Sequence, residues 1–66
     1  MFIRIYIEAE DGGEGFSGYA DTANRGGERV LLSDDENLWE LVKKLKKIAD
    51  HNDIAMIEIP VDLIPD

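Results

Sequence analysis

A glycine-rich segment comes closest to a known chemical motif. Residues 13–18 read G-x-G-x-x-G after an apolar stretch, the spacing with which dinucleotide-binding proteins hold a pyrophosphate. That chemistry requires the turn to open a helix, whose amide groups and positive end attract phosphate. Residues 16–20 are aromatic and alternating rather than helical, and Asp11 and Glu14 would repel an anion. We therefore interpret the glycines as a hairpin turn and expect no cofactor.

Clustered carboxylates are the second candidate, because their oxygens can bind a divalent cation. Their spacing is not that of an EF-hand loop, and a solvated acidic rim explains them better. Asp50, His51 and Asp53 are explained by a turn that ends a helix. With no cysteine and one histidine, the chain cannot assemble a thiolate or multi-histidine zinc site. We expect no metal.

Catalysis by a side chain is also disfavoured. A nucleophile, a base and an orienting group must lie close together. His51 is the single imidazole, and Ser17 is not in a G-x-S-x-G motif because Tyr19 occupies the last position. We expect the protein not to be an enzyme.

Charge is the strongest compositional feature. There are 15 acidic and 7 basic residues, a net charge of −8, and four of the basic residues are lysines within residues 43–47. Such a surface repels phosphates and anionic membranes, so the lysines are interpreted as a solvated helix face. No apolar run approaches the ~18 residues of a membrane span, and the first residues do not resemble a signal peptide. We expect a cytoplasmic protein with a basic protein partner, and no direct contact with nucleic acid or membrane.

The first half of the chain predicts three strands. Residues 2–8 alternate with the period of a half-buried strand, which places Ile3, Ile5 and Ile7 on the core face. Shorter strands are predicted at residues 16–20, which Gly18 should weaken, and at 28–32. Tight turns are expected at residues 11–15 and at Gly26-Gly27.

One amphipathic helix follows. Ser33 and Glu36 have capping-box spacing, so we predict Ser33 as the N-cap, and Asn52 as a left-handed C-cap. Glu40 and Lys44 should pair at i, i+4, and Trp39 should flank the core. The apolar stripe comprises Leu38, Leu41, Val42, Leu45, Ile48 and Ala49.

The last strand completes the predicted architecture. Residues 54–59 are nearly all apolar, which predicts a central strand, and Pro60 ends it. The sequence therefore predicts one acidic domain over residues 1–66, of the two-layer α+β class. Its order is β-β-β-α-β, with one helix on a small, mainly antiparallel sheet.

The order of these features resembles a known family. An isoleucine-rich strand (3–8), an acidic glycine turn (11–13), an aromatic strand (15–19) and a capped helix start (33–38) follow one another. Together they resemble the N-terminal domain of HicB-type antitoxins, over residues 2 to about 59. Two features depart from the family: its Pro-x-Leu-Pro-Gly-Cys stretch is replaced by residues 21–27, and residues 1–66 contain no DNA-binding segment, which we expect the protein to lack. The resemblance implies an inhibitor domain that covers a ribonuclease toxin.

A second resemblance is one of type alone. Small, acidic, cysteine-free proteins are similar to phage-encoded inhibitors, including anti-CRISPR proteins and DNA mimics, which present carboxylates to a basic groove. We therefore expect a non-enzymatic inhibitor of a nucleic-acid-handling effector, most simply an anti-CRISPR protein. A HicB-like antitoxin is the alternative, followed by an oligomerising module and a small hydrolase. The carboxylates expected to contact the partner are Glu8, Glu10, Asp11, Glu14 and Asp21, on the first sheet edge and turn, with Asp34 and Asp35 at the start of the helix.

Overall fold

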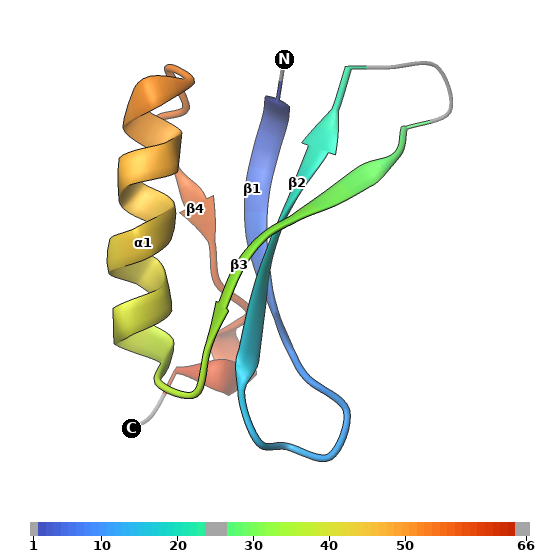
Figure 1. The fold of residues 1–66 in the computed structure, drawn as a ribbon, viewed down its shortest axis with the longest axis vertical. Helices are drawn as coiled ribbons and strands as arrows, with labels where there is room; N and C mark the ends of the chain where they lie inside the picture. The colour runs from blue at the N-terminus through green and yellow to red at the C-terminus, as the bar shows by residue number, and fades with distance from the viewer. Residues whose placement is uncertain (1, 24–26, 65–66) are drawn as a thin grey trace.

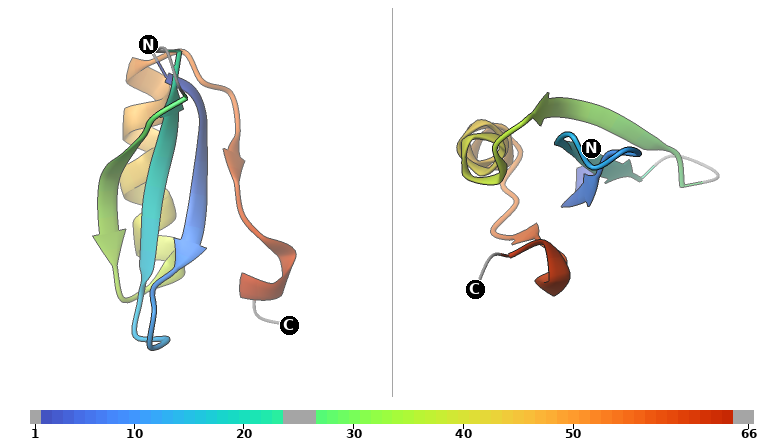
Figure 2. Two further views of the ribbon diagram at one scale, coloured as in Figure 1. Left: turned by 90° about the vertical axis from the view of Figure 1, so that its right-hand side faces the viewer. Right: turned by 90° about the horizontal axis from the view of Figure 1, so that it is seen from below.

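A four-stranded sheet with one long helix on one face forms the molecule (Figure 1). The computed structural model describes residues 2–23 and 27–64. The elements are β1 (Phe2–Ala9), β2 (Phe16–Thr22), β3 (Arg29–Asp35), α1 (Leu38–His51), β4 (Ile57–Glu58) and a 3-10 turn η1 (Val61–Leu63). The strands lie in the order β3-β2-β1-β4, and α1 covers one face of the sheet (Figure 2). The first three strands are antiparallel and β4 is parallel to β1, so the predicted α+β class and element order are confirmed.

The first hairpin turn depends on two glycines. Gly12 and Gly13 have φ of 89° and 72°, a region that side chains other than glycine rarely adopt. The turn is closed by the N–H of Glu10, which donates to the carbonyl of Gly15 at 2.9 Å. The hairpin interpretation of this segment is confirmed. Of the second predicted turn, Gly27 has φ of 63°, and Gly26 lies outside the described residues.

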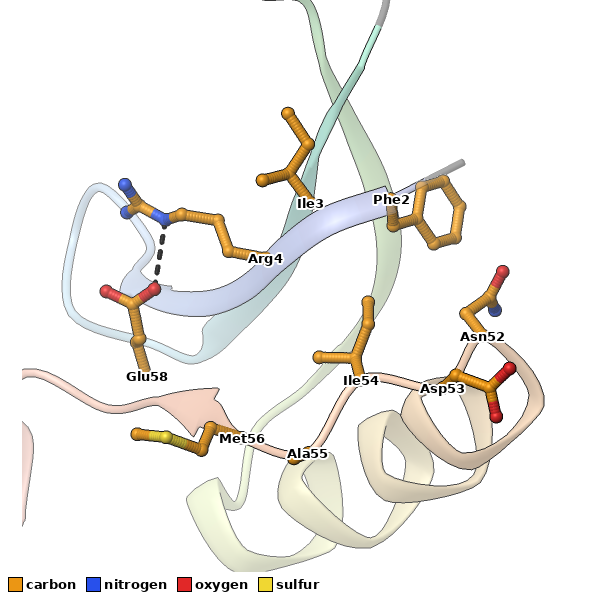
Figure 3. A pocket seen from close by; sticks show the side chains of 9 residues that line it. All are labelled: Phe2, Ile3, Arg4, Asn52, Asp53, Ile54, Ala55, Met56 and Glu58. Carbon is orange, nitrogen blue, oxygen red and sulfur yellow. Dashed lines mark ion pairs between the residues drawn. The ribbon is translucent and has the colours of Figure 1, made fainter.

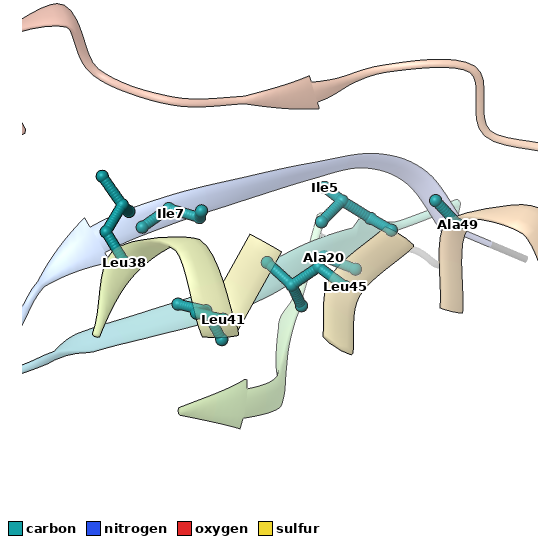
Figure 4. Close-up of a cluster of buried hydrophobic side chains, with 7 residues drawn as sticks. All are labelled: Ile5, Ile7, Ala20, Leu38, Leu41, Leu45 and Ala49. Atoms are coloured by element: carbon teal, nitrogen blue, oxygen red, sulfur yellow. The ribbon is translucent and has the colours of Figure 1, made fainter. Parts of the chain in front are cut away.

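The core lies between α1 and the two inner strands (Figure 4). Its fully enclosed side chains include Ile5, Ile7, Leu41 and Leu45. Gly18 faces Leu45 so closely that an added Cβ would lie 2.6 Å from its methyl groups. The expectation that Gly18 weakens β2 misses this role, because the missing side chain is what lets α1 approach the sheet. β2 also extends two residues beyond the predicted strand.

The prediction that Ile3 lies on the core face is wrong, since the residue is 62% exposed. The pairing of β1 with β2 passes from Phe2 opposite Thr22 to Arg4 opposite Asp21, so Ile3 is an extra residue in β1. Such a bulge shifts the alternation by one. Phe2 packs against the core in place of Ile3.

The predicted capping box is also wrong. Ser33 lies within β3, opposite Gly18, and the N-cap of α1 is Asn37. The Oδ1 of Asn37 accepts from the N–H groups of Trp39 at 2.9 Å and Glu40 at 3.1 Å. Sheet pairing extends β3 past Ser33, and Asn is as good an N-cap as Ser.

Other details of α1 differ from the prediction. Asn52 is the C-cap but has φ of −114°, and the left-handed residue is Asp53, with φ of 54°. Glu40 pairs with Lys43, at 3.2 Å, rather than with Lys44. Trp39 is 48% exposed and does not flank the core as expected, because it lies about 100° around α1 from the buried Leu38 and so faces solvent.

The last strand was predicted as central but lies at the edge of the sheet. β4 has two residues and pairs only with β1, with Ile57 opposite Ile5. Three side chains of this segment, Ile54, Ile57 and Ile59, pack partly on the core, while Met56 is 74% exposed. The apolar run therefore reflects packing along one side, not burial on both faces.

Candidate functional site

The strongest concentration of charge lies where β1 ends and β3 ends. Antiparallel pairing sets Phe16 opposite both Ala9 and Asp35, so the hairpin turn and the end of β3 meet at one end of the sheet. A shallow hollow opens there. We call this region the acidic end, and it is lined by Glu10, Glu14, Gly15, Asp34, Asp35 and Glu36.

Two of its carboxylates are held by the fold. The Oε1 of Glu10 accepts from the hydroxyl of Ser17 at 3.0 Å, and Ser17 is buried. A Cβ at Gly15 would lie 3.2 Å from the backbone carbonyl of Asp35 and 3.4 Å from Oε2 of Glu10, so this glycine leaves room for the Glu10 side chain beside the end of β3. The fold therefore restrains the Glu10 carboxylate at this end of the sheet.

Asp35 is also fixed electrostatically. Its Oδ1 accepts from the backbone N–H of Asn37 at 2.8 Å, and its Oδ2 lies 3.0 Å from the Nζ of Lys44. The hydrogen bond from the Asn37 backbone and then the hydrogen bond from Lys44 lower the pKa of the Asp35 carboxyl below its ordinary value. Asp35 therefore stays ionised at neutral pH.

The remaining acids of this region are open to solvent. Glu14, Asp34 and Glu36 are exposed, and within the described residues their carboxylates form no ion pair. Lys44 is the cation that contacts the region, through Asp35 and the carbonyl of Asp34. Five carboxylates against this one ammonium leave a strong negative charge.

Three of the seven predicted acids lie elsewhere. Glu8 bonds Arg29 at 2.8 Å, and Asp21 lies 3.5 Å from Arg4, both away from the hollow. Asp11 is exposed in the turn but does not line the hollow. The expected "first sheet edge" is also wrong, because β1 and β2 are the inner strands. Sequence reasoning missed Glu36 by giving it a capping role, although it directly follows two predicted acids.

The sheet face opposite α1 has a different character. The rings of Tyr6 and Tyr19 stack with centroids 5.9 Å apart. Arg4 lies over Tyr6 at 4.5 Å and Arg29 over Tyr19 at 4.1 Å. Because each arginine also pairs with a carboxylate, charge on this face is largely balanced.

A second groove separates the start of β1 from the segment before β4 (Figure 3). Phe2, Ile3 and Met56 give it an apolar lining, and Arg4 closes one end through a 3.1 Å ion pair with Glu58. The groove brings together no set of groups suited to proton transfer.

Residues 2–23 and 27–64 contain no arrangement typical of a metal site or of a catalytic group. No group of three or more potential metal ligands gathers there. The start of β2, to which Ser17 belongs, and the end of α1, to which His51 belongs, lie at opposite ends of the molecule (Figure 1). No helix in this described part is long and apolar enough to cross a bilayer.

In comparisons with known proteins, the chain matches no protein-family model, no curated protein and no solved structure.

Proposed function

We propose that this protein is a non-enzymatic inhibitor whose acidic end binds a basic, nucleic-acid-binding surface of an effector protein. The observation that carries the proposal is the hollow lined by five carboxylates. These come from two segments, residues 10–14 and 34–36, which the sheet holds together.

The arrangement suits competition with a phosphate backbone. A basic groove binds nucleic acid largely through its phosphates, and carboxylates at fixed positions offer the same charge. The hydrogen bonds to Glu10 and Asp35 reduce the entropy lost on binding. Glu14, Asp34 and Glu36 remain free to meet lysine and arginine side chains.

The effector is proposed to be a CRISPR complex in the bacterial cytoplasm, and the protein a phage-encoded anti-CRISPR. The alternative is a ribonuclease toxin, neutralised by a HicB-like antitoxin. It is favoured by the element order β-β-β-α-β with an acidic glycine turn, the order implied by that resemblance. Both partners present a basic surface to nucleic acid.

The experiment measures whether the protein prevents purified CRISPR effectors from binding target DNA in mobility-shift assays. The ribonuclease toxin that a HicB-type antitoxin neutralises, assayed for RNA cleavage, tests the alternative. The diagnostic variant is Glu14→Lys with Glu36→Lys, since both side chains are exposed and lie outside the strands. The matched control is Glu28→Lys with Asp50→Lys, two exposed acids that lie before β3 and near the end of α1, at the opposite end of the sheet from the acidic end.

Both variants change the net charge by the same amount, so they differ only in where the replaced acids lie. We expect wild type and control to block the effector and the diagnostic variant to lose the block. Inhibition by all three proteins, or loss in both variants alike, would contradict a role for the acidic end. Blocking of the toxin alone would favour the antitoxin.

A further inference from the structure

One of the four lysines of α1 contacts the acidic end. The Nζ of Lys44 lies 3.0 Å from Oδ2 of Asp35 and donates to the backbone carbonyl of Asp34, also at 3.0 Å. Lys47, one turn further along α1, is exposed and forms no ion pair among residues 2–23 and 27–64. Lys44 therefore differs from Lys47 in its contacts and not in its charge.

Two oxygens of neighbouring residues bind the ammonium group of Lys44. One belongs to the carboxylate of Asp35 and the other to the backbone carbonyl of Asp34, and both are acceptors that suit a cation. The other carboxylate oxygen of Asp35 accepts from the backbone N–H of Asn37, which holds the carboxylate independently of Lys44. The fold therefore provides a binding position for one cationic group at the acidic end, and Lys44 occupies it in the free protein.

We propose that Lys44 is an internal competitor for the acidic end, and that an arginine of the partner displaces it from Asp35. The inference rests on the proposed function, because it describes how the same site receives its basic partner. Asp35 lines the hollow, so a partner side chain that enters the hollow can reach the carboxylate. The internal ammonium group thus marks the position that a cation of the partner takes on binding.

Arginine is the cation that gains most from this exchange. Its planar guanidinium group donates two parallel hydrogen bonds to one carboxylate, whereas the ammonium group of a lysine acts as a point charge. Each oxygen of an ionised carboxylate has two lone pairs. Asp35 can therefore accept a guanidinium group and keep its hydrogen bond from Asn37.

The contact of Lys44 can be exchanged at little cost. Half of the Lys44 side chain is exposed, so water competes with Asp35 for its ammonium group. Once released, this group would be hydrated as the ammonium group of Lys47 is. While it stays bound, Lys44 offsets part of the negative charge of the acidic end and lowers the affinity of this region for other cations.

The test measures by isothermal titration calorimetry how tightly the purified chain binds an octa-arginine peptide at constant salt. Lys44→Met and its control Lys47→Met each remove one positive charge from α1, so they change the net charge equally. Lys44→Met should bind the peptide about threefold more tightly than Lys47→Met, because it also frees the carboxylate of Asp35. In an Asp35→Asn background this difference should disappear, because no carboxylate remains to be freed.

Equal affinities of the Lys44→Met and Lys47→Met variants overturn the proposal, and so does a difference that persists in the Asp35→Asn background. Far-UV circular dichroism checks that each variant is folded. Wild type needs no substitution: the peptide should shift the carbon NMR signals of the Lys44 side chain and of the Asp35 carboxyl group. Unchanged Lys44 signals, including those of a chain that does not bind the peptide, overturn the proposal as well. No effector takes part, so the proposed function is decided separately by the mobility-shift assay.

Discussion

The core and the acidic end differ in how far their side chains are buried and in how much those side chains stabilise the fold. Leu41 and Leu45 are fully buried, and Leu45 packs so closely on Gly18 of β2 that no side chain would fit between them. Glu14, Asp34 and Glu36 are exposed and stabilise little, because charges in water interact weakly. Substitutions in the core should therefore destabilise the fold, whereas substitutions of these three carboxylates should change stability little. Carboxylates that repel one another and do not stabilise the fold indicate that this region serves to bind a partner.

The largest effect is expected from Leu45→Ala, which empties the centre of the core. Deletion of an enclosed leucine costs ~2–5 kcal/mol of unfolding free energy. Urea denaturation measures the change, with Leu31→Ala as control because Leu31 is 54% exposed. A loss below about 0.5 kcal/mol, the scale of a surface substitution, would show that α1 does not pack as described.

Gly18→Ala tests the fit between β2 and α1. Its Cβ would lie 2.6 Å from Leu45, so overpacking should cost ~1–3 kcal/mol. In a Leu45→Ala background the added methyl group should be tolerated, giving a clear coupling energy in the double-mutant cycle. Additive effects would argue against the close approach.

The two candidate caps of α1 should differ. Asn37→Ala removes the acceptor for two N–H groups and should cost ~0.5–2 kcal/mol. Ser33→Ala lies in β3 and should cost less than about 0.5 kcal/mol. A larger loss of stability for Ser33→Ala than for Asn37→Ala in thermal denaturation would show that Ser33 is the N-cap after all.

Acid should weaken the contact that joins the acidic end to α1. The pKa of Asp35 is lowered in the folded state, so its contribution is present above the unfolded value of about 3.9. This contribution is lost as pH falls through the lower, folded pKa. Stability measured from pH 6 downward should therefore fall more steeply below about pH 4 in wild type than in Asp35→Asn. Parallel curves would exclude the contribution.

The sequence analysis predicted correctly the features that depend on residues close together in the chain. The helix stripe and the glycine turn depend on local spacing, and both are present. The bulge at Ile3, the extension of β3 through Ser33 and the edge position of β4 depend on pairing between distant segments. The spacing of residues along the chain does not show which distant segments pair with one another.

The same limit applies to the candidate site. Net charge identified acids as the relevant groups, and Glu10, Glu14, Asp34 and Asp35 do line one hollow. The sequence could not show that Arg4 and Arg29 lie against Asp21 and Glu8, because these pairs form across strands. Sheet pairing, rather than residue type, decides which acids remain available.

Glu14→Lys with Glu36→Lys should have the smallest effect on stability, within about 0.5 kcal/mol of wild type in urea denaturation. Both side chains are exposed and make no ion pair among the described residues. A loss comparable to that of Gly18→Ala would show that the acidic end has a structural role.

The most direct test of the account is the rate at which the protein associates with the effector that it blocks, measured at increasing salt. Electrostatic steering predicts fast association that slows as salt screens the charges. Glu14→Lys with Glu36→Lys should slow association markedly and flatten the salt dependence. Glu28→Lys with Asp50→Lys should stay close to wild type. Equal rates for both variants, or an association rate independent of salt, would contradict binding through the acidic end.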